Sequence, residues 1–260
     1  MQLRVVILAL GIMTALLGAA MIPCWLLDVA DGREEWPVFA ASATVLLLFG
    51  GGLVIMAGHR DERAGAREAF LLTVLVWVVL PAVAAIPFMG IGMSVTDAMF
   101  ESISGLTTTG STVMTGLDNQ PRGILLWRAI LQWFGGIGSI VTAIAILPVL
   151  RVGGMQLFQL ESSDVSGKFV PRISEVSAQI GMIYLFISVA CAAAYMLCGM
   201  TSFEAIAHAM TTVSAGGYST YDASFGAFYE TPAVPTAIFF MIVAGLPFSL
   251  LALAMIHGRV

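Results

Sequence analysis

Long apolar runs dominate this 260-residue chain, and polar residues gather in short segments between them. A helical run of about 20 apolar residues matches the roughly 30 Å hydrocarbon core of a bilayer. The sequence lacks the short alternating segments that are typical of a membrane β-barrel. The pattern therefore predicts an all-α integral membrane protein with six spans, at residues 5–27, 36–57, 69–89, 123–150, 178–198 and 233–256.

Two shorter semi-apolar stretches, residues 96–106 and 202–213, lie between the predicted spans. Each stretch is too short to cross a bilayer, which favours a re-entrant helix. Thr96 and Ser202 are the candidate N-caps, and each is followed by an acidic residue in the first turn. About ten helical residues cover roughly 15 Å. Each re-entrant helix is therefore expected to end near mid-membrane.

The order of these elements repeats along the chain. Each unit consists of a span, a short helix, a loop rich in Gly, Ser and Thr, and a second span. Superposing Gly110 on Gly216 relates the two units by 106 residues. A repeated pair of spans is typical of pseudo-symmetric transporters and channels. The predicted divisions are two N-terminal helices at 1–68, a first pore repeat at 69–150, a cytoplasmic loop at 151–177 and a second pore repeat at 178–260.

Composition and charge agree with a membrane protein and exclude several other classes. The chain is 59% hydrophobic and 10% charged, whereas soluble domains carry roughly 25% charged residues. The chain has no basic patch of the kind that indicates nucleic-acid binding. The dispersed histidines and the absence of catalytic motifs argue against an enzyme. The cysteines lie in apolar runs and are expected to be small buried side chains, at Cys24, Cys191 and Cys198.

The basic residues predict the orientation. With the N-terminus in the cytoplasm, most of them fall on the inner side, as the positive-inside rule requires. The C-terminus is then cytoplasmic too, and both re-entrant helices enter the membrane from outside. The inner residues are Arg4, Arg60, Arg63, Arg67, Arg151, Lys168, Arg172 and Arg259.

The loops that follow the re-entrant helices are the candidate cation site. The C-terminal end of a helix carries partial negative charge, which favours a cation at mid-membrane. Extended backbone at this depth is tolerated only where it is buried or lines a water-filled path. Its carbonyl oxygens can replace the hydration shell of an alkali ion, and glycine allows the backbone geometry that this requires. The loops therefore predict a cation pathway.

The loops and their flanking helices resemble the Trk/Ktr family of potassium uptake proteins, and most closely its TrkH branch. The matching strings are FESISGLTTTGSTV (100–113), LWR (126–128), QWFGGIG (132–138), ILPVLRVGGMQ (146–156) and TTVSAGGYST (211–220). The resemblance implies potassium uptake across the cell inner membrane, with no organic cofactor. It also implies a homodimer in the lipid bilayer, regulated by a peripheral cytoplasmic nucleotide-binding subunit of the TrkA type. The implied potassium ligands are backbone groups of Thr108, Thr109, Gly110, Ser214, Ala215 and Gly216.

Two departures from the family pattern qualify this interpretation. Ala215 stands where the family usually has threonine, a mild change if the ligand is the main-chain oxygen. Family members carry four pore units and this sequence carries two, so a truncated subunit is expected. The alternatives are a non-conducting assembly fragment of the transporter and a sodium-permeable or sodium-coupled relative.

Three further polar residues are candidate anchors for the re-entrant helices. Arg128 lies inside the fourth span, where a charged residue is by default a functional hypothesis. The simpler alternative is an arginine that extends to the membrane surface. The hypothesis is that Arg128 holds the first re-entrant helix through Glu101, and that His208 serves the second helix in the same way.

Overall fold

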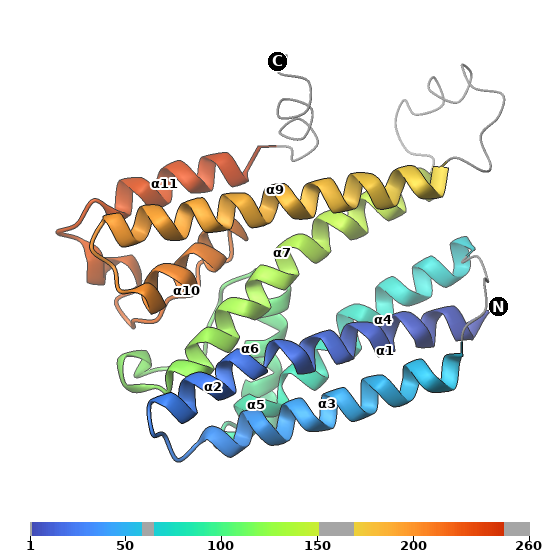
Figure 1. Cartoon of the computed structure of the whole chain (residues 1–260), viewed down its shortest axis with the longest axis horizontal. Coiled ribbons are helices and arrows are strands. Elements are labelled where there is room, and N and C mark those ends of the chain that lie inside the picture. Colours follow the sequence, from blue (N-terminus) through green and yellow to red (C-terminus); the bar gives the residue numbers. More distant parts are fainter. Residues whose placement is uncertain (1, 59–64, 151–168, 247–260) are drawn as a thin grey trace.

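The computed structural model describes residues 2–58, 65–150 and 169–246, and all regular elements in these ranges are helical, as the sequence predicted. Figure 1 shows the first helices bundled together and α7 running from them toward α9–α11. The helices are α1 Leu3–Ala20, α2 Ile22–Ala30, α3 Trp36–Ala57, α4 Ala66–Ala84, α5 Ile86–Gly90, α6 Val95–Leu106, α7 Arg122–Leu150, α9 Phe169–Leu197, α10 Ser202–Val213 and α11 Ala233–Ala244. Short 3-10 turns cover Leu117–Asn119 and Ser224–Phe228.

Five helical segments within the described residues are long and apolar enough to cross a membrane, and they match the first five predicted spans. They are Leu3–Ala30, Trp36–Ala57, Arg67–Gly90, Arg122–Ile140 and Ser177–Leu197. The sixth prediction begins at α11, and residues 247–256 lie outside the described residues. Helix α9 starts at Phe169, before the predicted 178. Main-chain hydrogen bonding can continue a helix through polar residues after the apolar run has ended.

Prolines divide two of the spans into a long and a short helix. Pro23 and Pro87 occupy the first turns of α2 and α5. Proline has no N–H group and its ring clashes with the carbonyl four residues earlier, so the preceding helix ends. The apolar runs therefore continue through Met21 and Ala85, while the helices do not.

Helices α1 and α3 pack closely because glycines remove side chains from their contact. A Cβ atom added to Gly50 would lie 2.6 Å from Ala15 N and 2.7 Å from Gly11 O. Small residues allow this approach between membrane helices. A Cβ at Gly51 or Gly52 meets nothing within 4 Å. Of these three glycines, Gly50 is the packing residue.

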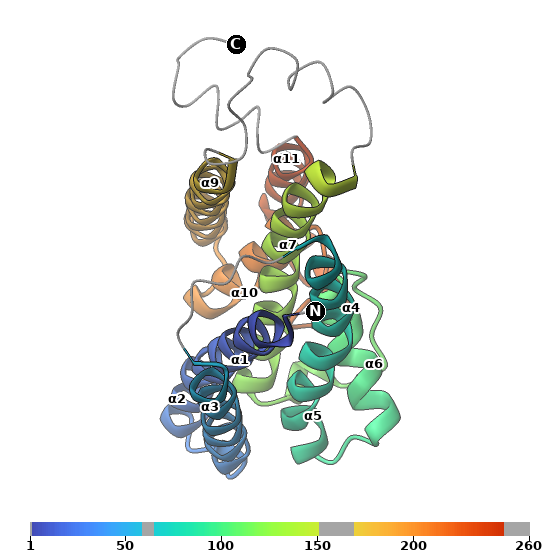
Figure 2. The same cartoon turned by 90° about the vertical axis from the view of Figure 1, so that its right-hand side faces the viewer.

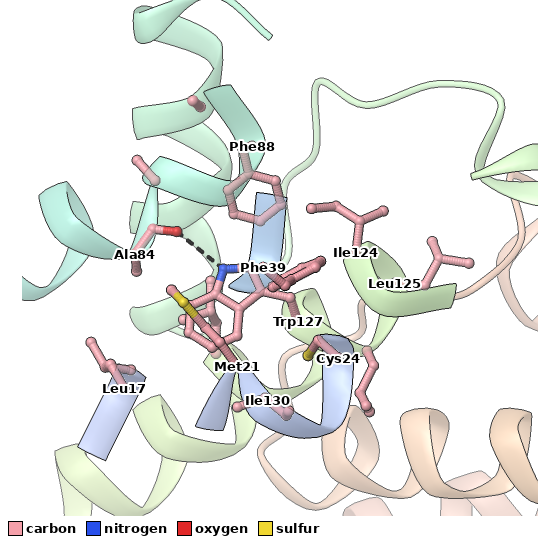
Figure 3. Close-up of a cluster of buried hydrophobic side chains, with 14 of the residues drawn as sticks. Leu17, Met21, Cys24, Phe39, Ala84, Phe88, Ile124, Leu125, Trp127 and Ile130 are labelled. Atoms are coloured by element: carbon pink, nitrogen blue, oxygen red, sulfur yellow. Dashed lines mark hydrogen bonds between the residues drawn. The ribbon is translucent and has the colours of Figure 1, made fainter. Parts of the chain in front are cut away.

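Trp127 on α7 lies at the centre of the apolar core that joins the first helices to the first pore unit. Its side chain is fully buried, and Figure 3 shows it among side chains of α1, α2, α3 and α5. Its indole Nε1 donates to Ala84 O at 3.1 Å, and the Phe39 ring meets it edge-on at 6.3 Å. This core fixes α7 against the first three spans.

The cysteines have the expected environment. Cys24 and Cys191 are fully buried and Cys198 is partly buried, and all three are free thiols. Cys24 belongs to the core around Trp127, whereas Cys191 packs with α10 and α11 in a second apolar cluster. Cys24 and Cys191 are small buried side chains, as predicted, whereas Cys198 is only partly buried.

Candidate functional site

The two re-entrant helices, α6 and α10, have the same length and the same type of N-cap. Ser94 Oγ accepts a hydrogen bond from Asp97 N at 3.1 Å. Thr201 Oγ1 accepts from Glu204 N at 3.4 Å. The N-caps predicted at Thr96 and Ser202 are therefore wrong. The cap must have extended backbone and lie three residues before the N–H that it accepts, which selects Ser94 and Thr201.

The backbone after each helix has the same pattern of left-handed residues. In the first loop, Thr108 has φ +55° and Gly110 has φ +79°. In the second loop, Ala215 has φ +55° and Gly217 has φ +76°. The repeat is therefore offset by 107 residues, and the predicted superposition of Gly110 on Gly216 is wrong by one. Both glycines occupy a region that a side chain disfavours.

The corrected offset defines two glycine segments: the first at residues 108–110 and the second at residues 215–217. The predicted Ser214 is the C-cap of α10 and has right-handed helical backbone. Sequence reasoning missed Gly217 as the partner of Gly110. Counting from Asp97 and Glu204, which also lie 107 residues apart, would have found it.

The two glycine segments are in direct contact. A Cβ atom on Gly110 would overlap Gly216 O, and a Cβ on Gly216 would lie 2.6 Å from Gln132 Nε2. Residues far apart in the chain thus meet at the positions predicted from the sequence. Side chains are excluded there by space as well as by backbone conformation.

Helix α7 brings the two segments together. Figure 2 shows α6 and α10 on either side of α7, and both contact it. A Cβ on Gly135 would overlap Leu106 O at the end of α6, and a Cβ on Gly136 would lie 2.9 Å from Ser214 Cβ after α10. These two glycines allow α7 to pack against the ends of α6 and α10, while a Cβ at Gly138 would meet nothing within 4 Å.

Arg128 and Glu101 form a buried ion pair beside the first glycine segment. Arg128 Nε lies 2.8 Å from Glu101 Oε1, and the side chains are 1% and 0% exposed. An arginine extending to the membrane surface is therefore ruled out. Glu101 also accepts from the Thr112 hydroxyl at 2.9 Å and from Val113 N at 3.1 Å. The carboxylate thus holds the extended loop that follows the first glycine segment.

Arg128 also reaches the second unit. Its Nη1 donates to Ser219 O at 2.9 Å, and its guanidinium lies 4.1 Å from the centre of the Tyr218 ring. The Tyr218 hydroxyl donates to Glu101 O at 2.9 Å. One guanidinium therefore bridges both loops, and Tyr218 is a further functional candidate that the sequence did not single out.

His208 occupies in α10 the position that Glu101 occupies in α6, again 107 residues apart. Its Nδ1 lies 2.8 Å from Glu204 O, and its Nε2 lies 3.0 Å from Ser219 Oγ. Phe225 and Phe228 pack edge-on against the imidazole. His208 thus contacts the loop that follows the second glycine segment. Ser219 binds both residues, with its hydroxyl at His208 and its carbonyl oxygen at Arg128.

The glycine segments present main-chain oxygen atoms, which are ligands of the kind that alkali ions prefer. In the parts of the chain that the structure describes, no three His, Cys, Asp or Glu residues gather as a metal-binding group. Hard alkali ions prefer oxygen, and carbonyl rings at half-membrane depth supply it without a fixed charge. The buried carboxylate of Glu101 is already paired with Arg128.

The fold and this site define a class of membrane protein, built from units of helix, re-entrant helix, glycine loop and helix. The chain belongs to the TrkH family of cation transport proteins, whose family model matches residues 35–259. The chain is 40% identical over 266 residues to the Trk system potassium uptake protein TrkH of Vibrio parahaemolyticus, covering 100% of this chain and 55% of the relative.

Other relatives show the same extent of similarity. The TrkH of Escherichia coli K12 is 41% identical over 262 residues, covering 97% of this chain and 54% of the relative. The crystal structure of the potassium transporter TrkH from Vibrio parahaemolyticus superposes with a TM-score of 0.87 at 37% identity, covering 99% of this chain and 53% of that one. The chain thus spans about half the length of the curated relatives it matches.

Proposed function

We propose that this chain forms two of the pore units of a potassium uptake pathway, in which main-chain oxygens of the two glycine segments bind the ion. The proposal rests on one observation: the segments at 108–110 and 215–217 touch each other across the repeat, at Gly110 and Gly216 O. Two copies of one backbone motif that lie in contact can present their carbonyl oxygens to one ion, and this supports a shared ion path.

Potassium is the ion that the chemistry and the relatives favour. A hydrated alkali ion loses water on entering the segments, and carbonyl dipoles must replace it at similar free energy. The relatives are named potassium uptake proteins. Two segments supply only part of a coordination shell, so we propose that conduction requires further pore units, consistent with the greater length of those relatives.

The predicted ligand set includes Ser214 and extends only to Gly216. The register of the backbone supports Ala215, Gly216 and Gly217 as the set equivalent to Thr108, Thr109 and Gly110, because their left-handed residues coincide. We therefore add Gly217 to the proposed ligands. The cytoplasmic termini are retained as a prediction from the basic residues, and the homodimer and the TrkA-type regulatory subunit as predictions of the family resemblance.

Complementation of a potassium-uptake-deficient cell tests the proposal. The chain is expressed alone, and also joined to the C-terminal half of Vibrio parahaemolyticus TrkH. We expect growth on low potassium, and uptake of labelled potassium in preference to sodium, from the joined protein. If the joined protein restores growth and the chain expressed alone does not, the chain is a part that needs the further pore units. The absence of alkali-ion uptake from the joined protein, correctly inserted in the membrane, refutes the function, and uptake without potassium preference refutes the ion assignment.

A further inference from the structure

Gln132 is the polar side chain that lies between the two glycine segments. It comes from α7, one turn after Arg128, and residues four apart share a helix face. Its side chain is fully buried. Its Oε1 accepts from Tyr218 N at 3.0 Å, immediately after the second segment. One half of the amide is therefore committed to the second pore unit.

The other half of the amide is a buried donor that has no hydrogen-bond partner among the described residues. Gln132 Nε2 is the atom concerned. It lies 3.7 Å from the Cβ position of Gly110, and 2.6 Å from that of Gly216. The amide cannot be reversed, because Tyr218 N needs an acceptor and only Oε1 provides one. The free donor therefore faces the main chain where the two segments meet.

A buried amide donor without an acceptor is unfavourable, and native proteins rarely retain one. The main chain of both segments lies next to this donor, closer at Gly216 than at Gly110, and its carbonyl groups are the acceptors that a cation would also use. A hydrogen bond from Nε2 would orient the carbonyl oxygen that accepts it, and that oxygen would keep a second lone pair for the ion. The number and position of the available oxygens set the preference among alkali ions.

From these contacts we propose that Gln132 is a positioning residue for ion selectivity. Its Oε1 holds the second glycine segment through Tyr218 N, while its Nε2, which has no partner among the described residues, is the donor that faces the main chain where the two segments meet. The side chain thereby sets the separation of the two segments and the orientation of the main-chain oxygens beside it. This inference rests on the proposed function, since it assigns a role within the same pathway.

Two substitutions separate the two halves of the amide. Gln132→Glu keeps the shape and the acceptor and, as a carboxylate, replaces the donor by a negatively charged oxygen, while Gln132→Met keeps the length and removes both. Gln179→Glu makes the same chemical change at an exposed position on α9 and is the matched control. The first measurement is potassium and sodium uptake by the chain joined to the C-terminal half of Vibrio parahaemolyticus TrkH.

Both Gln132 variants are expected to lower the ratio of potassium to sodium uptake by about tenfold, the factor given by one net hydrogen bond. The control keeps the wild-type ratio. If the wild type prefers potassium and both variants keep that preference, the positioning role is refuted while the proposed function stands.

Hydrogen exchange of the chain alone, in detergent micelles, is a second measurement that does not depend on conduction. Exchange at the Tyr218 amide should rise about tenfold in Gln132→Met and stay unchanged in Gln132→Glu, because one hydrogen bond is lost only in the former. Exchange across residues 108–111 should rise in both variants, with α1 and α3 unchanged as evidence of folding. If residues 108–111 exchange in both variants at the same rate as in the wild type, the proposal is overturned. This outcome holds even if the joined protein takes up no ion.

Discussion

Replacing Arg128 by methionine removes a guanidinium that contacts both pore loops. The change leaves the Glu101 carboxylate buried, with the Thr112 hydroxyl and Val113 N as its remaining donors. Removing one partner of a buried ion pair costs about 3–5 kcal/mol, because the other charge stays unpaired in a medium of low dielectric. Glu101→Gln creates the reverse defect. In the double variant neither charge remains, so its cost is expected to fall below the sum of the two single costs by about 2–3 kcal/mol.

Equilibrium unfolding of the chain in mixed micelles measures these free energies through tryptophan fluorescence. The chain provides its own control on the same helix: Arg122 pairs with Asp31 at the surface, where the side chains are 45% and 18% exposed. Exposed pairs contribute about 0.2–1 kcal/mol. The corresponding cycle, Arg122→Met with Asp31→Asn, should therefore show a small coupling energy.

A coupling energy for Arg128 and Glu101 no larger than that of the surface pair would refute the reasoning. Exchanging the two charges provides a second check. If the charge-swapped protein recovers none of the stability that each single change loses, the two residues do not act as a pair.

Three further predictions concern backbone space and the surface pair. Gly110→Ala should abolish potassium preference in the joined protein, because φ is +79° and the added Cβ overlaps Gly216 O. The joined protein with Gly138→Ala should conduct normally, because the added Cβ meets nothing within 4 Å. Gly50→Ala should lower the free energy of unfolding by about 1–3 kcal/mol through overpacking of α1 against α3, and alanine at position 51 should not. Arg122 holds the pKa of Asp31 below its usual range. The ionised Asp31 therefore stabilises the fold fully above about pH 4, and this contribution to the free energy of unfolding is lost as the pH falls through the lowered pKa. Unfolding at a series of pH values should therefore show Asp31→Asn less stable than wild type at pH 7 and equal to it once Asp31 is protonated; a constant difference would contradict this.

The elements of the fold could be read from the sequence because the bilayer imposes a length and a polarity on each of them. A span needs about 20 apolar residues, so the apolar runs of the five described spans were recognised, although the helix of the fifth begins at Phe169, nine residues before the predicted start. The half-length helices could be recognised for the same reason, since twelve residues cannot cross. Their N-caps were misplaced because several adjacent hydroxyl residues fit the pattern, and only backbone conformation distinguishes Ser94 from Thr96.

The candidate site was only partly predictable. The sequence singled out Gly110 and Gly216 because glycine permits the backbone geometry of an ion-binding loop, and Arg128 and Glu101 because charge is unusual at membrane depth. The sequence did not determine the register of the repeat. Gly216 and Gly217 are adjacent, and either glycine can be aligned with Gly110 when only the residue types are compared. The left-handed backbone decides between them: Gly217, not Gly216, has the conformation of Gly110.

What the sequence alone determined is therefore the set of helices and the kinds of residue between them, since both follow from local length, polarity and backbone freedom. The tertiary structure decided which groups meet. The contact of Gly110 with Gly216 joins residues 106 positions apart, and the Gln132 bond to Tyr218 N joins residues 86 positions apart. Such contacts depend on how α7 packs between α6 and α10. No local pattern carries that information, because it arises from the combined shape of three helices.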